Sequence, residues 1–402
     1  MGHKHSCICP HRYFHTGYTD TFTQATQILS HRLHRYSHTG YTDTLTQATQ
    51  ILSHKLHRYF HTGCTDTFTL AIQISSHWLH RYPLTGRKEI CYNRFMTKQY
   101  TSFASALVDL FDTSVAIART DRLQGGDINK AYALTLNTGD KIFMKANAKD
   151  NASFFTAESD GLSAIASTKA IRTPQILGTG TDDGEEVGYS FLLLRYIESG
   201  EKNKNFWENL ARNLAALHKA DTSNLISEGK SAGSEFPFGF AQDNFIGARP
   251  QINRPAATWI DFFRDNRLKP QFTAADPYFT PSDREKITKL LDNLDHFLTE
   301  PGKPSLLHGD LWSGNIMCGT DGKAVLIDPA CYVGHREADI AMTQLFGGFP
   351  EDFYAAYKEA WPLEEGYEER RDLYNLYQLL NHLNLFGKDY LEPVLSIIGE
   401  YV

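Results

Sequence analysis

The pattern of hydrophobic and polar positions divides the chain into two unlike parts, because a regular alternation of strand-like and helix-like stretches begins only at Met96. An amphipathic stretch, MTKQYTSFASALVDLF, opens this second part. Two strand candidates flank a polar Gly-Gly turn in ARTDRLQGGDINKAYALTL (118–136), and DKIFMKAN (140–147) alternates as another strand. These patterns predict a sheet near the start of the second part.

The predicted elements that follow are mostly helical. They are a helix at 153–167, an apolar strand at 189–200, helices at 205–220 and 281–300, and a short strand at 323–330. In the helix at 281–300, Ser282 and Glu285 have the spacing of a capping box, which predicts where the helix begins. A small sheet followed by helices predicts an α+β enzyme.

The first 95 residues form a tandem repeat instead. Copies of 23 residues occupy 11–33, 34–56 and 57–79, and a fourth copy breaks off. Each copy offers few apolar side chains among Thr, His and Gln, whereas a solenoid repeat must bury an apolar face against its neighbour. We therefore expect residues 1–95 to be disordered or to be an over-extended reading frame that is not native.

Histidine is concentrated in the first 95 residues, which hold 12 of the 17 histidines. The segment HKHSCIC (3–9) also places His and Cys close together. No repeat pairs two Cys with two His at zinc-finger spacing, which argues against a metal site. A metal- or partner-binding role for the repeats is nevertheless one alternative function.

Composition fits a globular protein of 402 residues, with 41% hydrophobic residues and no apolar run of about 18 residues that would span a membrane. The chain shows no secretory pattern, and its six cysteines show no framework spacing, so we expect a cytoplasmic protein without a membrane partner. Residues 1–95 carry 10 Lys and Arg against 4 Asp and Glu, which leaves 30 against 43 in the rest. That acidic remainder predicts no nucleic-acid partner.

The clearest chemical motif is LHGDLWSGN (307–315). Phosphoryl transfer needs a carboxylate that accepts the hydroxyl proton and oxygen ligands that hold Mg²⁺ against the phosphates. Asp310 is the candidate base, Asn315 is a candidate metal ligand, and Asp328, 18 residues after Asp310, is the second ligand. We expect His308 to brace the loop. The order of these residues predicts a phosphotransferase, and the alternative is a turn cap followed by a surface carboxylate.

Residues further upstream fit the nucleotide half of such a site. Lys145 ends an alternating strand, and Glu158 lies on the next helix candidate, as do the phosphate-binding Lys and its orienting Glu in kinases. For either residue alone, a solvated charge is the alternative. Gly125 and Gly126 would let backbone N–H groups approach an anion, although most such pairs are plain hairpin turns.

These motifs resemble the kinase-like phosphotransferases that include aminoglycoside and choline kinases, and more closely the fructosamine kinase (ketosamine 3-kinase) family. The closer resemblance rests on HGDLWSGN and on the segments 125–132, 243–253, 259–271, 328–349 and 373–387, so that it covers about 96–402. It implies a bilobal protein-kinase-like fold, with an antiparallel-sheet N-lobe at 96–197 and a helical C-lobe at 198–402. It also implies ATP and Mg²⁺ as cofactors.

The resemblance further implies phosphorylation of the sugar 3-hydroxyl of a ketosamine, after which the adduct breaks down and frees the amine. Position by position, Asp310 is then the base, Asn315 and Asp328 bind Mg²⁺, Lys145 and Glu158 hold the phosphates beside Gly125 and Gly126, and Arg195, Tyr196 and Ile197 lie at the hinge. Asp339 is expected to brace the catalytic loop through hydrogen bonds.

Four polar or aromatic residues are candidates for the substrate side. Trp312 offers a flat face on which sugar C–H groups can pack, with core packing as the alternative. Asp243, Asn244 and Gln251 are polar in a segment that we expect to face the cleft.

Two rival functions differ in class. The first is a kinase of the same fold whose acceptor is an aminoglycoside, choline or another small alcohol, and the segments within 243–271 disfavour it. The second is a binding protein that has lost catalysis. Such a protein would be expected to lack one of the four central residues, and the sequence has Lys145, Asp310, Asn315 and Asp328.

Overall fold

The computed structural model describes residues 97–402 except 125–128, 185–186 and 227–234. All of the described residues belong to one compact unit, Ala71–Val402. The repeats at 1–95 and the predicted turn at Gly125 and Gly126 lie outside the described residues. In the part of the chain that is described, no helix combines the length and apolar character that crossing a bilayer requires.

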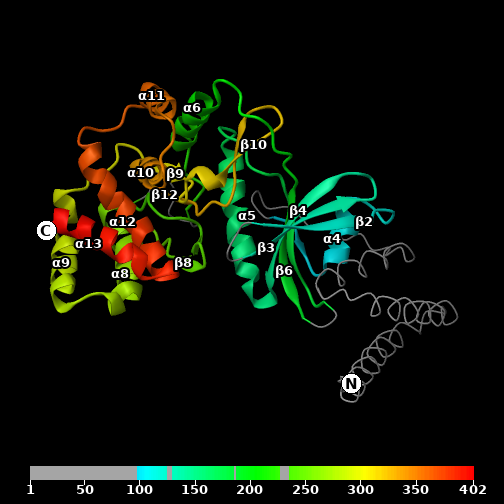
Figure 1. Cartoon of the computed structure of the whole chain (residues 1–402), viewed down its shortest axis with the longest axis horizontal. Helices are drawn as coiled ribbons and strands as arrows, with labels where there is room; N and C mark the ends of the chain where they lie inside the picture. Colours follow the sequence, from blue (N-terminus) through cyan, green and yellow to red (C-terminus); the bar gives the residue numbers. More distant parts are fainter. Residues whose placement is uncertain (1–96, 125–128, 185–186, 227–234) are drawn as a thin grey trace, which may run out of the picture. The chain divides into compact units, whose positions relative to one another are not determined.

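The first part of the described chain is built on a six-stranded sheet (Figure 1). Its order is β1-β5-β6-β4-β3-β2, and every pairing is antiparallel except that of β1 with β5. The strands are β1 (Gln99–Tyr100), β2 (Ile117–Leu123), β3 (Lys130–Leu136), β4 (Lys141–Ala148), β5 (Ile176–Asp182) and β6 (Tyr189–Arg195). The central strand β6 is buried along all but its last residue, which explains its continuous apolar sequence.

Two α-helices and one short 3-10 helix accompany the sheet. They are α4 (Phe103–Leu110), η2 (Lys149–Asn151) and α5 (Ala152–Ser167). The side chain of Ser102 caps α4 by accepting a hydrogen bond from the backbone N–H of Ser105. Helix α5 packs Phe155 and Leu162 against Leu192 and Leu194 of β6, which fixes this helix on the sheet.

The second part of the described chain is mostly helical. Its helices are α6 (Phe206–His218), α7 (Trp259–Phe262), η3 (Phe263–Leu268), α8 (Lys269–Ala275), η4 (Asp276–Tyr278), α9 (Pro281–Asp292), η5 (Leu294–His296), η6 (Ser313–Asn315), α10 (Glu337–Leu345), α11 (Glu351–Ala360), α12 (Tyr367–Phe386), η7 (Lys388–Tyr390) and α13 (Leu391–Glu400). The indole of Trp259 is fully buried among the rings of Phe262, Phe263, Tyr332 and Tyr374 at the centre of this part.

Three short antiparallel strand pairs lie between these helices. They are β7 (Asn244–Ile246) with β8 (Arg249–Gln251), β9 (Ser305–Leu307) with β12 (Tyr332–Gly334), and β10 (Ile316–Cys318) with β11 (Ala324–Leu326). The loops that leave β9 and β11 carry the motif residues discussed below.

The predicted capping box at Ser282 and Glu285 is wrong, because the helix begins two residues earlier. Thr280 is the N-cap, its side chain accepts from the N–H of Asp283, and the Asp283 side chain accepts from the N–H of Thr280. Pro281 occupies the first helical position, which suits a residue with no N–H to satisfy. The helix also ends at Asp292, well before residue 300.

The sheet and the helical part are connected by residues 196–205. Ser199 forms an isolated bridge with Gly319, and the N–H of Gly200 donates to the carbonyl of Cys318 over 2.9 Å. A Cβ on Gly200 would lie 2.4 Å from the carbonyl oxygen of Gly319, so this close approach requires glycine. The connection is therefore held against the β10–β11 hairpin.

Candidate active site

Asp310 lies in a loop whose backbone course depends on glycine. Gly309, at the end of β9, has φ +82°, and a Cβ there would lie 2.1 Å from the carbonyl oxygen of Ala330. The N–H of Ala330 donates to the carbonyl of His308 over 2.9 Å. The loop after β9 and the loop after β11 are thus in direct backbone contact, and no other residue type fits at position 309.

Asp339, in the first turn of α10, binds the backbone N–H groups of this glycine and of the residue before it. Its carboxylate accepts from the N–H of His308 over 2.7 Å and from the N–H of Gly309 over 2.9 Å. The buried imidazole of His218 lies 3.2 Å away, between Asp339 and the hydroxyl of Tyr357. This arrangement places Asp339 where the sequence predicted that it braces the catalytic loop.

His308 is a buried neutral imidazole whose tautomer follows from its partners. The N–H of Asp310 donates to Nδ1 over 3.3 Å, so Nδ1 carries no proton, and Nε2–H donates to the carbonyl of Ile327 over 3.0 Å. Burial lowers the pKa of His308, which keeps the ring neutral. His308 therefore ties the catalytic loop to the residue before Asp328, and both ring nitrogens are already engaged.

Asn315 holds the carboxylate of Asp310. Its amide N–H₂ group donates to the backbone carbonyl of Asp310 over 2.8 Å and to Oδ2 of the same residue over 3.0 Å. Burial raises the pKa of Asp310 to about 7 against the opposing hydrogen bond from Asn315. The negative charges of Asp328 and Asp339 add to this rise. The pKa of the Asp310 carboxyl therefore lies well above that of an ordinary aspartate.

The β10–β11 hairpin brings Asp328 to the same place. Ile316 pairs with Leu326, and the N–H of Ile327 donates to the carbonyl of Asn315 over 3.0 Å. Asp328 follows directly with φ +54°, a left-handed conformation that short polar side chains adopt more readily than others.

Lys145, Glu158 and Asp328 form an ion cluster that joins the sheet, α5 and the loop after β11. Nζ of Lys145 lies 2.8 Å from Oε1 of Glu158 and 2.6 Å from Oδ1 of Asp328. Burial opposes the charged form of Lys145, but the two carboxylates outweigh it and hold the pKa of Lys145 above its ordinary value. Burial also opposes the charged form of Glu158, which for a carboxyl group raises the pKa. The structure thus brings together two predicted nucleotide residues and one predicted metal ligand.

Helix α5 is also fixed from the helical part, through the β7–β8 hairpin. The rings of Phe154 and Phe245 stack with centroids 3.9 Å apart and planes inclined by 13°. One turn and a half further along α5, the carboxylate of Asp160 accepts a hydrogen bond from the amide of Gln242. These two contacts hold the helix that carries Glu158.

Three of the predicted substrate residues belong to the β7–β8 segment. Asn244 is buried and donates to the carbonyl of Cys331 over 2.7 Å, while buried Gln251 donates to the carbonyl of Ala330 over 3.0 Å. Asp243 is exposed, and its carboxylate accepts from the N–H of Asn253 over 2.7 Å. The two amides therefore bind the backbone just after Asp328, and only the carboxylate of Asp243 faces solvent.

Trp312 lies two residues after Asp310 with 38% of its surface exposed. Its ring occupies the space that a side chain at Gly314 would need, since a Cβ there would lie 2.4 Å from the indole. Its edge approaches Phe346, with centroids 6.4 Å apart. Glycine at 314 therefore lets the indole lie flat over the loop with its outer part in solvent.

The predicted hinge residues follow β6. Arg195 is exposed, and its N–H donates to the carbonyl of Gln175 over 2.8 Å. Tyr196 and Ile197 are half-buried, and Nζ of Lys141 lies 5.3 Å from the centre of the Tyr196 ring. Residues 195–197 thus lie at the start of the connection between sheet and helices, and their role as a hinge stays a prediction.

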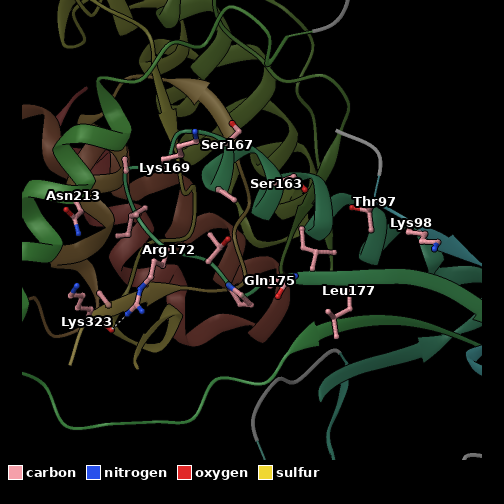
Figure 2. A pocket seen from close by; sticks show the side chains of 17 residues that line it. Thr97, Lys98, Ser163, Ser167, Lys169, Arg172, Gln175, Leu177, Asn213 and Lys323 are labelled. Carbon is pink, nitrogen blue, oxygen red and sulfur yellow. Dashed lines mark hydrogen bonds between the residues drawn. The ribbon is translucent and has the colours of Figure 1, made fainter. Parts of the chain in front are cut away.

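A hollow of about 1020 Å³, separate from the residues described above, lies against α5 (Figure 2). Its walls come from α5, the segment 168–175, β5, α6 and β11, and none of the predicted site residues lines it. Arg172, which points into it, is already paired with Asp321 at 3.0 and 2.9 Å.

Several supporting residues escaped sequence reasoning. Gln378 of α12 donates to the carbonyl of Gly309 over 2.9 Å, and it lies in a stripe of buried polar residues with Asn375 and Asn381. A polar residue at every third position of the mainly apolar stretch 373–383 was the signal that could have revealed them. No sequence pattern indicated the contact of Lys145 with Asp328, because 183 residues separate the two.

Among the described residues, no three His, Cys, Asp or Glu side chains lie together so that they could hold a metal ion by themselves. A site for Mg²⁺ needs fewer protein ligands, because Mg²⁺ in nucleotide sites binds one or two side chains together with phosphates and waters. Asn315 uses only its N–H₂ group in the hydrogen bonds to Asp310, which leaves its amide oxygen as a ligand. Asn315 and Asp328 therefore fit such an ion.

A carboxylate held by an amide, beside a cluster of Lys, Glu and Asp, is the arrangement of a kinase-like phosphotransferase. The α+β bilobal fold agrees with this class. The chain belongs to the fructosamine kinase family, since the family profile described as "Fructosamine kinase" matches residues 99–402.

Known relatives agree with this family. The chain is 41% identical to a probable ketoamine kinase of Synechocystis over 286 residues, which are 69% of this chain and 88% of the relative. It is 40% identical to a chloroplastic protein-ribulosamine 3-kinase of Oryza sativa subsp. indica, over 71% of this chain and 79% of that protein. The crystal structure of a putative fructosamine-3-kinase from Haemophilus somnus superposes with TM-score 0.65 at 30% identity, covering 75% of this chain and 97% of the other.

Proposed function

We propose that this protein is an ATP-dependent kinase that phosphorylates the sugar 3-hydroxyl of ketosamines and so initiates their deglycation. The observation that carries the proposal is the hydrogen-bonded convergence of Asp310 and Asn315 of one loop with Asp328 of a second loop and Lys145 of β4, three separate segments. The choice of ketosamines is supported by family membership and by relatives whose names specify ketoamines and protein-bound ribulosamines.

In this proposal Asp310 accepts the proton of the 3-hydroxyl while the hydroxyl oxygen bonds to the γ-phosphorus and ADP leaves. Its pKa of about 7 suits a group that must take up a proton near neutral pH. Asn315 fixes the carboxylate for this transfer through the 3.0 Å hydrogen bond. This hydrogen bond supports the proposed pairing of a base with an orienting amide.

Lys145, oriented by Glu158, would hold the phosphates of ATP, and Gly125 and Gly126 would cover them. Arg195, Tyr196 and Ile197 would offer the hinge backbone to the adenine ring. Asn315 and Asp328 would hold Mg²⁺, which neutralises charge on the phosphates when bound. Asp328 would then exchange part of its contact with Lys145 for the metal.

On the acceptor side, Trp312 would pack against the sugar, and Asp243 would contact its polar groups. For Asn244 and Gln251 we now propose a supporting role, because their amides bind the carbonyls that follow Asp328. His308 and Asp339 support the loop of the base in the same way. We also propose that the lobes divide near residue 197, that residues 1–95 are dispensable, and that the enzyme acts in the cytoplasm without nucleic acid.

The test is consumption of ATP by the full chain with Mg²⁺ and a panel of acceptors, namely ribuloselysine, fructoselysine, choline and kanamycin. The proposal predicts turnover on the ketosamines and none on the other two alcohols. A matched assay of residues 96–402 should give the same rates. Turnover on choline or kanamycin alone would support kinase activity but exclude ketosamines as the substrate.

A further inference from the structure

A continuous chain of aromatic rings, here called the aromatic strip, leads away from the catalytic loop. It consists of Trp312, Phe346, His382, Phe386 and Tyr390. The centroids of Trp312 and Phe346 are 6.4 Å apart, and those of Phe346 and His382 are 4.8 Å apart. His382 lies 5.4 Å from Phe386 and 5.1 Å from Tyr390. Each ring is therefore in contact with the next, from two residues past Asp310 outward.

Two of the five rings of the strip are exposed, and the other three are half-buried. Among the described residues, four large apolar side chains are classed as exposed, and two of them, Trp312 at 38% and Phe386 at 54%, belong to the strip. They come from distant parts of the sequence, the loop after β9 and the end of α12. Exposed aromatic side chains that meet in one chain of contacts mark a binding surface more often than scattered ones do.

The outer part of the strip is connected to the catalytic loop by hydrogen bonds. Nδ1–H of His382 donates to the carbonyl of Gln378 over 2.8 Å, while the side chain of Gln378 donates to the carbonyl of Gly309 over 2.9 Å. Gly387, with φ +94°, ends α12 and turns the chain so that Tyr390 returns beside Phe386. One residue of α12 thus anchors both the strip and the loop of the base.

We propose that the aromatic strip binds the amine-bearing side of the ketosamine, that is, the glycated lysine and the peptide segment around it. The inference rests on the proposed function. With the sugar 3-hydroxyl at Asp310 and the sugar against Trp312, the remainder of the substrate extends along a neighbouring surface. The strip begins at that point, and its ring contacts lead through Phe346 and His382 to Phe386 and Tyr390.

The chemistry of this part of the substrate matches the strip. A ketosamine nitrogen is a secondary amine that is protonated at neutral pH, and aromatic faces attract such cations. The four methylenes of a lysine side chain pack on rings as apolar groups do. Burial lowers the pKa of His382, so a neutral imidazole in the middle of the strip does not repel the ammonium group. A protein segment would then contact the exposed face of Phe386.

The test compares two substrates of the full-length enzyme, a peptide with one fructosyl-lysine and the fructosamine of methylamine, which lacks the lysine stem. For Phe386→Ala we expect kcat/KM on the peptide to fall by about tenfold, mainly through KM. For the same variant, kcat/KM on the methylamine adduct should stay unchanged. Phe386→Tyr keeps a ring and should restore most of the loss. Val187→Ala, at an exposed apolar residue outside the strip, is the matched control and should change neither value.

Each other outcome is decisive. A wild-type enzyme that turns over neither ketosamine contradicts the proposed function and overturns the inference with it. A wild-type enzyme active on both, with Phe386→Ala unchanged on the peptide, overturns the strip alone. An equal loss on both substrates would show a structural effect of Phe386 and would also overturn the inference.

Discussion

The catalytic loop and the ion cluster lie side by side but are held in opposite ways. Asp310 is positioned by hydrogen bonds within the protein. Asp339 binds the backbone before it, and Asn315 binds its carboxylate. In the ion cluster, Lys145 and Asp328 neutralise each other directly at 2.6 Å. The loop is therefore held by hydrogen bonds within the protein, whereas the cluster consists of groups that a nucleotide and a metal would have to share.

This difference indicates where binding energy is used. Buried hydrogen bonds to backbone groups keep their geometry whatever enters the cleft, so the base is preorganised. An ion pair with one partner half-exposed, as Asp328 is, can open when phosphate oxygens and Mg²⁺ offer both residues new partners. Substitutions in the loop should therefore lower kcat, and those in the cluster should mainly affect the use of ATP.

The largest expected effect is that of Asp310→Ala. Removing the base should lower kcat by about 10² to 10⁴ while ATP affinity stays close to that of the wild type. Turnover and calorimetric binding of ATP would be measured on the same preparation. Asp328→Ala is the matched comparison, for which the binding of Mg²⁺-ATP itself should weaken. Undiminished turnover in Asp310→Ala would remove Asp310 as the base.

Asp339→Asn should have the next largest effect. The amide that replaces the carboxylate presents N–H groups to backbone donors of His308 and Gly309, so one of those hydrogen bonds is lost. We expect kcat to fall about 10- to 100-fold with little change in KM for ATP, and the thermal midpoint to fall as well. A rise in KM for ATP at constant kcat would contradict this, because it would show that Asp339 acts on nucleotide binding, as residues of the ion cluster do.

Lys145→Met should act mainly on the nucleotide. Loss of one charge-assisted contact with a phosphate should raise KM for ATP about tenfold. Glu158→Gln, which keeps Lys145 but weakens its orientation, should raise it less. Steady-state assays over a range of ATP concentrations distinguish the two. If both variants lowered kcat alone, the proposed division between the regions would be wrong.

The stack of Phe154 on Phe245 should couple α5, which carries Glu158 of the ion cluster, weakly to the β7–β8 hairpin. A double-mutant cycle with Phe154→Ala and Phe245→Ala should give a coupling of about 1 kcal/mol in the free energy of unfolding, the usual size for an aromatic pair. Chemical denaturation measures it. Additive single effects would show that the hairpin does not hold α5 through these rings.

The smallest expected effect concerns pH and stability at Asp160. Burial raises the pKa of Asp160 to about 6, while an unfolded Asp has a pKa of about 3.9. Between these values the unfolded state loses its proton first, so this carboxyl makes the fold less stable as pH rises. Asp160→Asn should therefore be more stable by about 1 kcal/mol at pH 8, after allowance for partial exposure. Near pH 3.5 the difference should vanish.

The sequence predicted the parts of the site that depend on short motifs. Asp310 and Asn315 lie five residues apart in one loop, so their hydrogen bonds follow from local geometry. Lys145 on a strand and Glu158 on the next helix were also predictable as neighbours. The position of the β6 strand followed from its apolar run.

Contacts between distant segments were not predictable in the same way. The ion pair of Lys145 with Asp328 and the bond of Gln378 to Gly309 depend on how whole elements pack. The start of α9 was ambiguous for another reason, because Thr280 and Ser282 both precede an acidic residue by three positions. Only the fit of Pro281 to the first helical position decides between them.

The most direct test of the account is the identity of the product. Full-length protein would be incubated with Mg²⁺-ATP and ribuloselysine, and phosphorus NMR would locate the transferred phosphate, with Asp310→Asn treated in parallel. The account predicts a phosphate ester on the sugar 3-oxygen with the wild type and almost none with the variant. Phosphate on another atom, or equal product from the variant, would contradict it.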